Sequence, residues 1–456
     1  MLIIYATLLL NLTFVKPNIL LMNSSVILII SLISTISMIL LIIFLPHIKI
    51  GKITFDTFYI PPLFAAIIIL SFSLVDINSM WNSFISDTSI NPLQILALFF
   101  SMSFLSIVLD EVGFFEYIAS KALKIAKNNQ YILFLIFYLL VSILTIFTSN
   151  DIIIITFTPF IIFFAKNAKI NPLPYLISEF VAANTWSMLF IIGNPTNIYL
   201  ASSFNVTFLE YFKMMGLPTL FAGLTSFVII FLLFRKSLKE PLNIEIPPVQ
   251  IKDKFILITS LSFLIITIIL MALSNIINIK MYLVCSIASI LLLLILLIYS
   301  CFKHNIIKVT GSSIKRLPYT LIPFVLSMFV IVFSLSSSGL TNEITKFLDN
   351  DYPILSYGIS SFITANLINN IPMSVLYSNI ISYSTIGGLT PVYASIISSN
   401  IAAFFTPIGA LAGIMWMSIL KNHDIKFTFL KFSLYGLIIS IPTLFMALLG
   451  LFLITL

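Results

Sequence analysis

Long runs of apolar residues, separated by short polar segments, cover most of the 456-residue chain. A helix needs about 20 apolar residues to cross a bilayer, so these runs predict a series of membrane crossings. The uninterrupted runs lie at 2–15, 25–45, 57–75, 94–109, 213–234, 255–274, 281–300, 318–336 and 431–455. The remaining apolar runs are interrupted by polar residues, and these interruptions distinguish the chain from a bundle of uninterrupted membrane-spanning helices.

Two of the interrupted runs predict helical hairpins. The first, 131–148/151–165, breaks at Ser149-Asn150-Asp151, and the second, 353–369/371–384, breaks at Asn369-Asn370-Ile371-Pro372. A polar break within the bilayer is costly unless it lines a protected or wet cavity. The alternative is a broken buried helix in which Asn150 or Asp151 only caps the next helix. Because paired interrupted segments in corresponding halves indicate a transporter site, we predict re-entrant hairpins whose arms are too short to cross and whose tips hold a solute.

Two other segments, 172–204 and 391–420, are interrupted by helix breakers. Gly193-Asn194-Pro195-Thr196-Asn197 breaks the first, and Thr406-Pro407-Ile408-Gly409 breaks the second. Glycine and proline free backbone groups, and the ends of the half-helices can then present them to a ligand. A structural kink is the alternative. We predict discontinuous helices, with the breaks at Gly193, Pro195, Pro407 and Gly409.

The order of elements occurs twice. Residues 25–234 and 255–456 each run as three crossings, a hairpin, a broken segment and a final crossing, joined by a polar linker at 235–254 and preceded by an extra helix within 1–24. Asn184 and Gly193 are nine residues apart, as are Asn400 and Gly409. The sequence therefore predicts an all-α polytopic membrane protein with two inverted-topology repeats, each with a re-entrant hairpin and a discontinuous helix.

The basic residues fit this layout. If loop 46–56 is cytoplasmic and each hairpin returns to the side it came from, 19 of the 23 Lys and Arg residues lie on the cytoplasmic side, as the positive-inside rule predicts. If 131–165 instead crossed once, every later loop would change sides and the bias would collapse. The residues on the opposite side are Lys16, Lys213, Lys280 and Lys346.

The composition narrows the function. The chain is 60% hydrophobic and 9% charged, with a mean hydropathy of +1.15, which excludes a soluble enzyme domain and, with its unbroken apolar runs, a β-barrel. The net charge of +7 sits in short loops and does not indicate nucleic-acid binding. With two cysteines and three loop histidines, we expect no metal site. The first residues lack a basic region and a cleavage site, so we expect an uncleaved first helix.

A few acidic residues are candidates for ion coupling. Asp151 is the one carboxylate that this layout places near mid-membrane, and it is either a proton or cation carrier or a cap of helix 152–165. Glu179 is either a proton relay or a residue of a cytoplasmic vestibule. Asp110-Glu111 and Glu116 lie at a membrane edge, where we expect an ion pair with Lys121 or Lys124.

Four motifs together resemble the ArsB family of arsenite permeases, in the wider ion transporter superfamily with NhaD antiporters and dicarboxylate carriers (the citrate transporter-like domain). Leu109-Asp110-Glu111-Val112-Gly113-Phe114-Phe115-Glu116 is similar to the family signature, and Asn150-Asp151 followed by Thr158-Pro159 resembles its first hairpin. Asn369-Asn370-Ile371-Pro372 and Thr406-Pro407-Ile408-Gly409 are similar to the corresponding motifs of the second half. Asn184 and Asn400 stand where arsenite permeases commonly carry an acid.

The resemblance implies a secondary active transporter of the inner or plasma membrane, bacterial, with an elevator motion of hairpins and broken helices. Arsenite or antimonite efflux coupled to H⁺ or Na⁺ is the first expectation, and a Na⁺/H⁺ antiporter or Na⁺-coupled dicarboxylate carrier is the second. An intramembrane enzyme would need a catalytic motif that the spans lack. We expect membrane lipid and a small weak acid or anion as partners and no cofactor or nucleic acid; a homodimer and an ATPase subunit stay open. The candidate solute contacts are Asn150, Asn184, Thr196, Asn197, Asn369, Asn370, Asn400 and Thr406.

Overall fold

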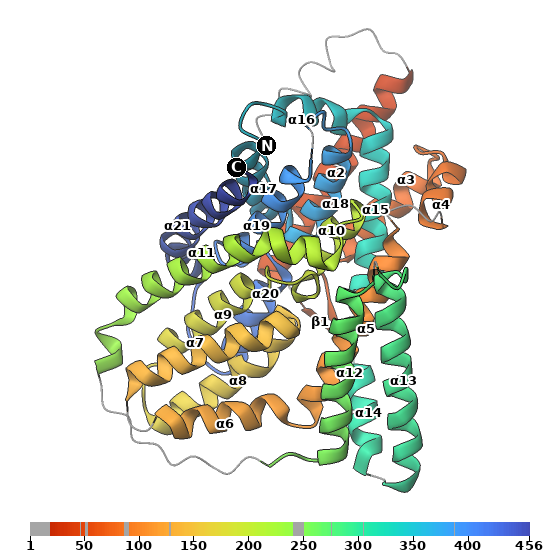
Figure 1. Cartoon of the computed structure of the whole chain (residues 1–456). Helices are drawn as coiled ribbons and strands as arrows, with labels where there is room; N and C mark the ends of the chain where they lie inside the picture. The colour runs from red at the N-terminus through yellow and green to blue at the C-terminus, as the bar shows by residue number, and fades with distance from the viewer. Residues whose placement is uncertain are drawn as a thin grey trace.

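A computed structural model describes residues 19–45, 47–50, 53–85, 91–126, 129–239, 250–274, 276–303, 305–386 and 388–456. The crossing expected at 2–15 lies outside these residues. Within them the chain is helical, apart from one antiparallel hairpin of β1 (His47–Ile50) and β2 (Ile53–Asp56) that links the first two helices. The structure therefore confirms an all-α polytopic architecture (Figure 1).

The described helices divide between the two halves predicted from the sequence, and α4, α6, α14 and α16 were not among the predicted elements. The first half contains α2 (Ile19–Phe44), α3 (Ile60–Ser71), α4 (Ile77–Ile85), α5 (Pro92–Glu111), α6 (Phe114–Ala126), α7 (Gln130–Phe147), α8 (Asn150–Ala168), α9 (Leu173–Trp186), the 3₁₀ turn η1 (Ile191–Gly193), α10 (Pro195–Ser203), α11 (Phe208–Phe234) and η2 (Ser237–Lys239). The second contains α12 (Lys254–Ala272), α13 (Met281–Phe302), α14 (Asn305–Lys315), α15 (Leu321–Ser337), α16 (Leu340–Leu348), α17 (Pro353–Ile368), α18 (Asn370–Ser382), α19 (Thr390–Ala402), α20 (Leu411–Asn422) and α21 (Phe429–Thr455).

Eight of the described helices are long and apolar enough to cross a membrane, and α15 with α16 forms a further bent pair with an angle of 79°. The crossing expected at 57–75 is shorter, because α3 ends at Ser71 after 12 residues. Large apolar side chains on the outer faces of α12 and α13, such as Ile258, Ile287 and Ile298, are more than half exposed, as suits contact with lipid.

Both predicted hairpins turn back on themselves. In the first, the ring of Phe137, in the middle of α7, lies 6.3 Å from that of Phe160 in α8. A straight helix would separate these residues by about 34 Å at 1.5 Å per residue, so the chain reverses at Thr148-Ser149. In the second, Tyr357 of α17 lies 6.5 Å from Tyr377 of α18.

One expectation about the first hairpin was wrong. Its arms were expected to be too short to cross a bilayer, but α7 has 18 residues and α8 has 19, and both meet the length and composition of a span. The second arm is longer than predicted because Lys166 and Asn167 extend it by one more turn, up to the left-handed Lys169. The re-entrant course of this hairpin stays a prediction that depends on the distribution of basic residues.

The halves pack together reciprocally. The helix α5, the third predicted crossing of the first half, packs on α12 and α13 of the second, and α15, the third predicted crossing of the second half, packs on α2 and α3 of the first. Figure 1 shows α5 beside α12 and α13, with α6 to α9 stacked on the other side of the molecule. Gly113 follows α5 and Gly339 follows α15, with φ of +84° and +81°, so glycine makes the same sharp turn in both halves.

The longest helices of the two halves, α11 and α21, form the most extensive helix pair. A Cβ at Gly450 would come within 2.9 Å of the Pro218 Cα, and near the other end of the pair Phe234 stacks on Tyr435 with ring centroids 5.6 Å apart. The beginning of α11 therefore meets the end of α21, and the two helices are antiparallel. Each contains one internal proline, Pro218 or Pro442.

Charged residues tie helix ends together at the edge predicted to be cytoplasmic. Arg316, just after α14, contacts Asp110 at 2.6 Å and Glu111 at 2.7 Å at the end of α5. The prediction that these acids pair with Lys121 or Lys124 was wrong. Arg316, which belongs to the second half and is 205 positions from Glu111, pairs with them instead. Lys303, just after α13, contacts Asp253 at 2.6 Å, and Asp253 caps the first turn of α12.

Candidate functional site

Asparagine side chains from both broken helices meet inside the protein. Asn194 and Asn197 come from the turn and first residues that open α10, and Asn400 comes from the last turn of α19. All three are at most 2% exposed. They are brought together because α9 and α19 both end inside the protein, where a polar turn follows each helix.

Asn400 has a complete set of hydrogen bonds. Its Oδ1 accepts from Asn194 Nδ2 at 2.9 Å and from Ser187 Oγ at 3.0 Å. Its Nδ2 donates to Asn197 Oδ1 at 2.7 Å and to the Ile396 carbonyl at 2.9 Å. Because every donor and acceptor of this amide is used, Asn400 fixes the two broken helices relative to each other.

A second contact between the broken helices is made by hydroxyl groups. Thr196 Oγ1 lies 2.9 Å from Ser399 Oγ, and both side chains are fully buried. Asn197 Nδ2 donates to the Ser187 carbonyl at 2.8 Å, which holds α10 to the end of α9. These neutral groups complete a buried polar centre, called the amide centre below, which consists of Ser187, Asn194, Thr196, Asn197, Ser399 and Asn400.

The tip of the first hairpin lies against α9. Asn150 Nδ2 donates to Asn184 Oδ1 at 2.9 Å, and Asn184 Nδ2 donates to the Phe180 carbonyl at 2.8 Å. Two buried polar atoms at this tip, Ser149 Oγ and Asn150 Oδ1, have no hydrogen-bond partner among the described residues, in contrast to the amide centre. On α9, Thr185 Oγ1, next in the chain to Asn184, has none among them either. An unpartnered buried polar group costs about 1–3 kcal/mol, so a cluster of them is suited to binding a polar ligand.

The tip of the second hairpin is held by the break in the other helix. Asn369 has a φ of +76°, and its Nδ2 donates to the Ile408 carbonyl at 3.0 Å. The backbone N–H of Asn370 donates to the Gly409 carbonyl at 3.0 Å. The Asn370 side chain reaches the Ser399 carbonyl at 3.5 Å, next to the amide centre. Thr406 does not contact the amide centre, and its hydroxyl donates to Asn366 Oδ1 of α17 at 2.7 Å.

Two glycines at the breaks allow close backbone contact. A Cβ at Gly193 would lie 2.2 Å from the Ser187 carbonyl oxygen, and a Cβ at Gly409 would lie 2.2 Å from that of Ala402. Both distances are shorter than any real contact, so only glycine fits at either position. Pro195 is the first residue of α10 and Pro407 lies within the second break, so the four predicted helix breakers lie in the breaks or at their edge.

The two candidate coupling acids differ in their surroundings. Glu179 on α9 is 1% exposed, and both carboxylate oxygens accept from Thr158 Oγ1 of α8 at 3.2 Å. A carboxylate buried without a basic partner has a large desolvation cost, which a bound proton or cation removes. Asp151, in the first turn of α8, is half-buried, and its side chain makes no hydrogen bond or ion pair with the described residues.

The structure brings together most of the residues selected from the sequence, and it adds others. Asn184 and Asn150 form one pair, Thr196, Asn197 and Asn400 belong to the amide centre, and Asn369 and Asn370 border it, whereas Thr406 does not contact these groups. Sequence reasoning missed Ser187, Asn194 and Ser399, of which only Asn194, inside the Gly-Asn-Pro break, had a signal. No group of three or more His, Cys, Asp or Glu residues that could hold a metal occurs in the described part of the chain.

Comparison with known proteins places the fold and motifs in a family. The family model described as "Citrate transporter" matches residues 48–387, which is most of the chain and includes both hairpins. The chain belongs to the citrate transporter family. Membership confirms the resemblance found in the four motifs, and with the apolar helices it identifies this family member as a multi-pass membrane transporter of the cell membrane.

Curated relatives of this family member include arsenical pumps. It is 24% identical over 390 residues to an arsenical pump membrane protein of Escherichia coli, which covers 82% of this chain and 88% of the relative. The arsenical pump membrane protein of Yersinia enterocolitica is also 24% identical over 390 residues, with 82% and 87% covered. The human P protein is 29% identical over a shorter region of 137 residues, which is 30% of this chain and 15% of that protein.

Proposed function

We propose that this chain is a secondary active transporter that exports a small neutral oxyacid of the arsenite type by alternating access. The observation that carries the proposal is that the buried polar atoms Ser149 Oγ and Asn150 Oδ1 of the first hairpin tip have no partner among the described residues, nor has Thr185 Oγ1, beside Asn184 on α9. Hydroxyls can donate or accept a hydrogen bond and an amide oxygen accepts one, so the tip matches a solute that carries several hydroxyl groups.

The chemistry of the tip and the amide centre favours a neutral solute over a multiply charged one. Their side chains are amides and hydroxyls, and none of them is cationic. A tricarboxylate in such a site would lose its hydration without gaining a counter-charge. Arsenous acid, As(OH)₃, is mainly neutral near pH 7 and can donate and accept hydrogen bonds at each hydroxyl. The arsenical pumps among the relatives support the same solute class.

Ion coupling is assigned to Asp151 and Glu179. Asp151 stands beside Asn150 at the tip, where its charge state changes the field felt by a bound solute. Glu179 is buried on α9 five residues before Asn184, so a proton or Na⁺ bound there would stabilise the same helix end. Moving one charge through the membrane potential contributes about 2.3 kcal/mol per 100 mV, which is sufficient to drive export against a gradient.

The proposed movement is an elevator displacement of the hairpins and broken helices relative to a scaffold, in two inverted repeats. Two features support it: the antiparallel packing of α11 with α21, and the reciprocal packing of α5 and α15 on the opposite half. Helices that correspond in an inverted repeat must run in opposite directions, as α11 and α21 do.

A Na⁺-coupled carboxylate carrier, or a Na⁺/H⁺ antiporter, is the second candidate. The name of the matched family favours citrate. The oxygen atoms of Asn150, Glu179 and Asp151, with the carbonyls freed at the breaks, are the kind of ligand that Na⁺ prefers. In this case the unpartnered atoms at the tip would coordinate the cation and not the solute.

The proposal is tested by transport in proteoliposomes that contain only the purified full-length chain. We expect uptake of arsenite into inside-out vesicles that saturates and that depends on an imposed pH or Na⁺ gradient. Asn150→Ala should lower this uptake about tenfold, and the matched control Asn422→Ala, an exposed amide at the end of α20, should retain it. Gradient-driven citrate uptake without arsenite uptake would overturn the first candidate in favour of the second.

Growth assays separate the same alternatives in cells. Expression should rescue an arsenite-sensitive bacterial strain and leave a sodium-sensitive strain unrescued. Transport by the purified chain alone would show that no ATPase subunit is needed, and crosslinking of the reconstituted chain would report a homodimer. Flux that neither saturates nor follows a gradient would identify a passive channel and overturn both carrier candidates.

A further inference from the structure

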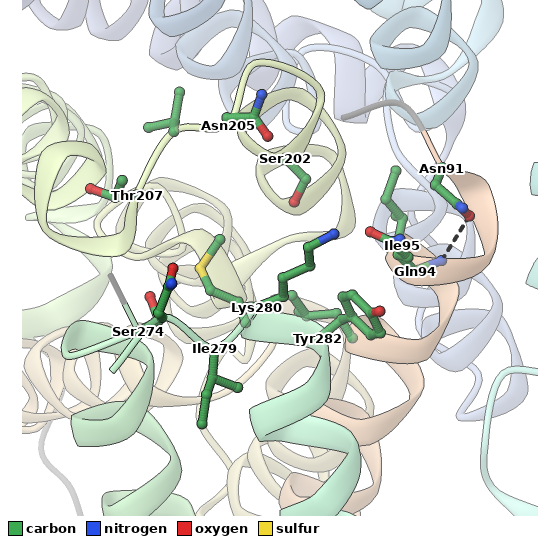
Figure 2. Close-up of a pocket in the computed structure, with 14 residues that line it drawn as sticks. Asn91, Gln94, Ile95, Ser202, Asn205, Thr207, Ser274, Ile279, Lys280 and Tyr282 are labelled. Carbon is green, nitrogen blue, oxygen red and sulfur yellow. Dashed lines mark hydrogen bonds between the residues drawn. The ribbon is translucent and has the colours of Figure 1, made fainter. Parts of the chain in front are cut away.

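Two of the described cavities border the broken helices. A polar one of about 430 Å³ lies where α5 begins, where α10 gives way to α11 and where α12 gives way to α13, and Figure 2 shows the side chains that line it. Three of these side chains, Asn91, Gln94 and Lys280, already interact with other groups. A smaller cavity of about 20 Å³ lies between apolar and aromatic side chains of α9, α20 and α21. Next to it are a hydrogen-bond donor and an acceptor that are not fully paired.

The donor is the indole N–H of Trp416, in the second turn of α20. This side chain is 1% exposed, and its Nε1 makes no hydrogen bond with the described residues. The ring is held by other aromatic rings, with its centroid 5.1 Å from that of Phe180 and 5.7 Å from that of Phe432. Because a buried indole N–H usually has a partner, an unpaired one indicates that its acceptor is engaged in another state of the protein.

The acceptor is the carboxylate of Glu179, which precedes Phe180 on α9. Both of its oxygens are 3.2 Å from Thr158 Oγ1, which has one hydrogen to share between them. A carboxylate has about four lone-pair sites, so most of its capacity to accept hydrogen bonds stays unused. The indole of Trp416 lies near enough to this carboxylate to interact with it electrostatically. An unpaired donor therefore stands beside an undersatisfied acceptor.

The surroundings of Glu179 supply no counter-charge. No ion pair to it occurs in the described part of the chain, and α7 and α19 carry no charged residue. Those of α8, α11, α20 and α21 lie towards the helix ends: Asp151, Lys166, Glu210, Lys213, Lys421 and Lys431. The tyrosines of these helices and of α9 are Tyr131, Tyr138, Tyr175, Tyr211, Tyr393 and Tyr435. A negative charge on Glu179 is thus stabilised by neutral donors, the Thr158 hydroxyl and the Trp416 indole.

Helix α20 connects this pair to the second break. It begins directly after the break, where the carbonyls of Ile408 and Gly409 hold the tip of the second hairpin. A Cβ at Gly413 would lie 2.7 Å from the Pro407 carbonyl oxygen, so the first turn of α20 packs directly on the break. The cavity beside the indole leaves room for a small shift of this helix. A movement of Trp416 towards α9 would therefore also move the carbonyls that hold the hairpin tip.

We propose that Trp416 is a positioning residue that links the charge of Glu179 to the second broken helix. When the carboxylate is charged, the indole N–H donates a hydrogen bond to it and draws α20 towards α9. When a proton or a cation neutralises the carboxylate, this bond is released, and the described conformation with its unpaired indole corresponds to that state. The part that this link has in transport rests on the proposed function, whereas the contact itself does not.

The test is an NMR titration of the full-length chain in nanodiscs, with ¹⁵N-labelled tryptophan, from about pH 5 to about pH 9. The chain has three tryptophans, so it gives three indole N–H signals, which Trp81→Phe and Trp416→Phe assign. We expect the Trp416 signal to move downfield as the pH rises, because a charged acceptor strengthens the hydrogen bond. Glu179→Gln should abolish this movement, and the matched control Glu343→Gln, an exposed carboxylate, should leave it unchanged.

A Trp416 signal that stays in place over the titration, or that moves equally in Glu179→Gln, would overturn the proposal. The signals of Trp81, which is 59% exposed, and of Trp186, whose Nε1 donates to Tyr138 at 3.3 Å, should not follow it. They also report whether each variant is folded.

Transport measurements test the consequence. In proteoliposomes, Trp416→Phe should lower the maximal rate of gradient-driven arsenite uptake about tenfold and change its KM less than about threefold, because the indole acts through Glu179 and does not contact the solute. Trp81→Phe should transport normally, and equal rates in the two variants would overturn the link to transport. The titration needs neither a gradient nor arsenite. A chain that transports arsenite without the Trp416 shift overturns this inference alone, and one that shows the shift but transports nothing overturns the proposed function alone.

Discussion

The tip of the first hairpin and the amide centre are built from the same kinds of residue, but they are satisfied to different degrees. Around Asn400 every amide atom has a partner, whereas at Asn150 the side-chain oxygen, the Ser149 hydroxyl and the Thr185 hydroxyl have none among the described residues. A satisfied buried network stabilises one arrangement of helices. An unsatisfied one retains the capacity to bind, so the two regions separate a structural role from a solute-binding role.

The same asymmetry appears in the acids. When Asn184 of the first half is aligned with Asn400 of the second, Glu179 aligns with Ser395. When Asn150 is aligned with Asn370, Thr158 aligns with Ser378. Asp151 corresponds to Ile371 in the same way. The first half therefore carries both candidate coupling groups, and the second half has neutral side chains at those positions. We infer that coupling belongs to the first half.

The largest effect is expected for Asp151→Asn. It keeps the size of the side chain and removes the charge, so gradient-coupled transport in proteoliposomes should fall more than about 100-fold, while membrane insertion and the unfolding temperature stay normal. Glu343→Gln, which alters an exposed carboxylate of the second half, is the control and should transport normally. Uphill transport that persists undiminished in Asp151→Asn would reduce Asp151 to a helix-capping residue.

Asn400→Ala should mainly change stability. It removes the partner of Asn194, Asn197 and Ser187 together, which should lower the free energy of unfolding by about 2–3 kcal/mol. Chemical denaturation in detergent measures this loss, and Asn422→Ala should change it by less than about 0.5 kcal/mol. A variant as stable as the unmodified chain would show that the amide centre does not hold the broken helices together.

Asn150→Ala should show the reverse pattern. It removes one hydrogen bond, to Asn184, so we expect a stability loss of about 1 kcal/mol. Transport of arsenite should nevertheless fall about tenfold, because the variant loses the acceptor of the tip. Parallel transport and denaturation measurements of Asn150→Ala and Asn400→Ala test the comparison directly, and equal ratios of the two effects would contradict it.

The smallest effect is expected at a helix junction of the second half. Burial acts to raise the pKa of the Asp253 carboxyl, but the contacts with Lys303 and the Ile256 amide outweigh it, and the pKa lies below its ordinary value. The contribution to stability is present at neutral pH and is lost as the pH falls below about 4. Lys303 is half exposed, so Lys303→Met should cost less than about 1 kcal/mol in thermal unfolding at pH 7. A larger cost that persists at a pH well below 4 would show that packing and not charge joins α12 and α13.

The sequence predicted the features that depend on local chemistry. The chain reverses at Thr148-Ser149 and at Asn369, and the helices break at Gly193 and Gly409, because polar residues, glycine and proline interrupt apolar runs at or next to these positions. Features that depend on distant partners could not be predicted. Arg316 forms the ion pair that was predicted for Lys121 or Lys124. Nothing in the sequence around Ser399 indicates that its hydroxyl lies within hydrogen-bond distance of Thr196.

The cavity that Lys280 lines could not be predicted from the sequence either. Asn91, Thr207 and Lys280, which all line it, are the N-cap residues of three separate helices, and nothing in the sequence near Asn91 or Thr207 indicates that Lys280 will lie beside them. The lysine was visible only as an exception to the charge distribution. Helix lengths were also misjudged where, as at α3, an apolar run continues past the end of the helix into a turn.

The long contact between α11 and α21 constrains how the molecule can work. These helices follow the two broken segments directly, one in each half, and they are locked along much of their length, from Gly450 against Pro218 to Phe234 against Tyr435. A shift of one hairpin unit would therefore drag the other with it. In the elevator motion proposed above, the two ends of the transport route would then open in turn through one shared displacement of both halves.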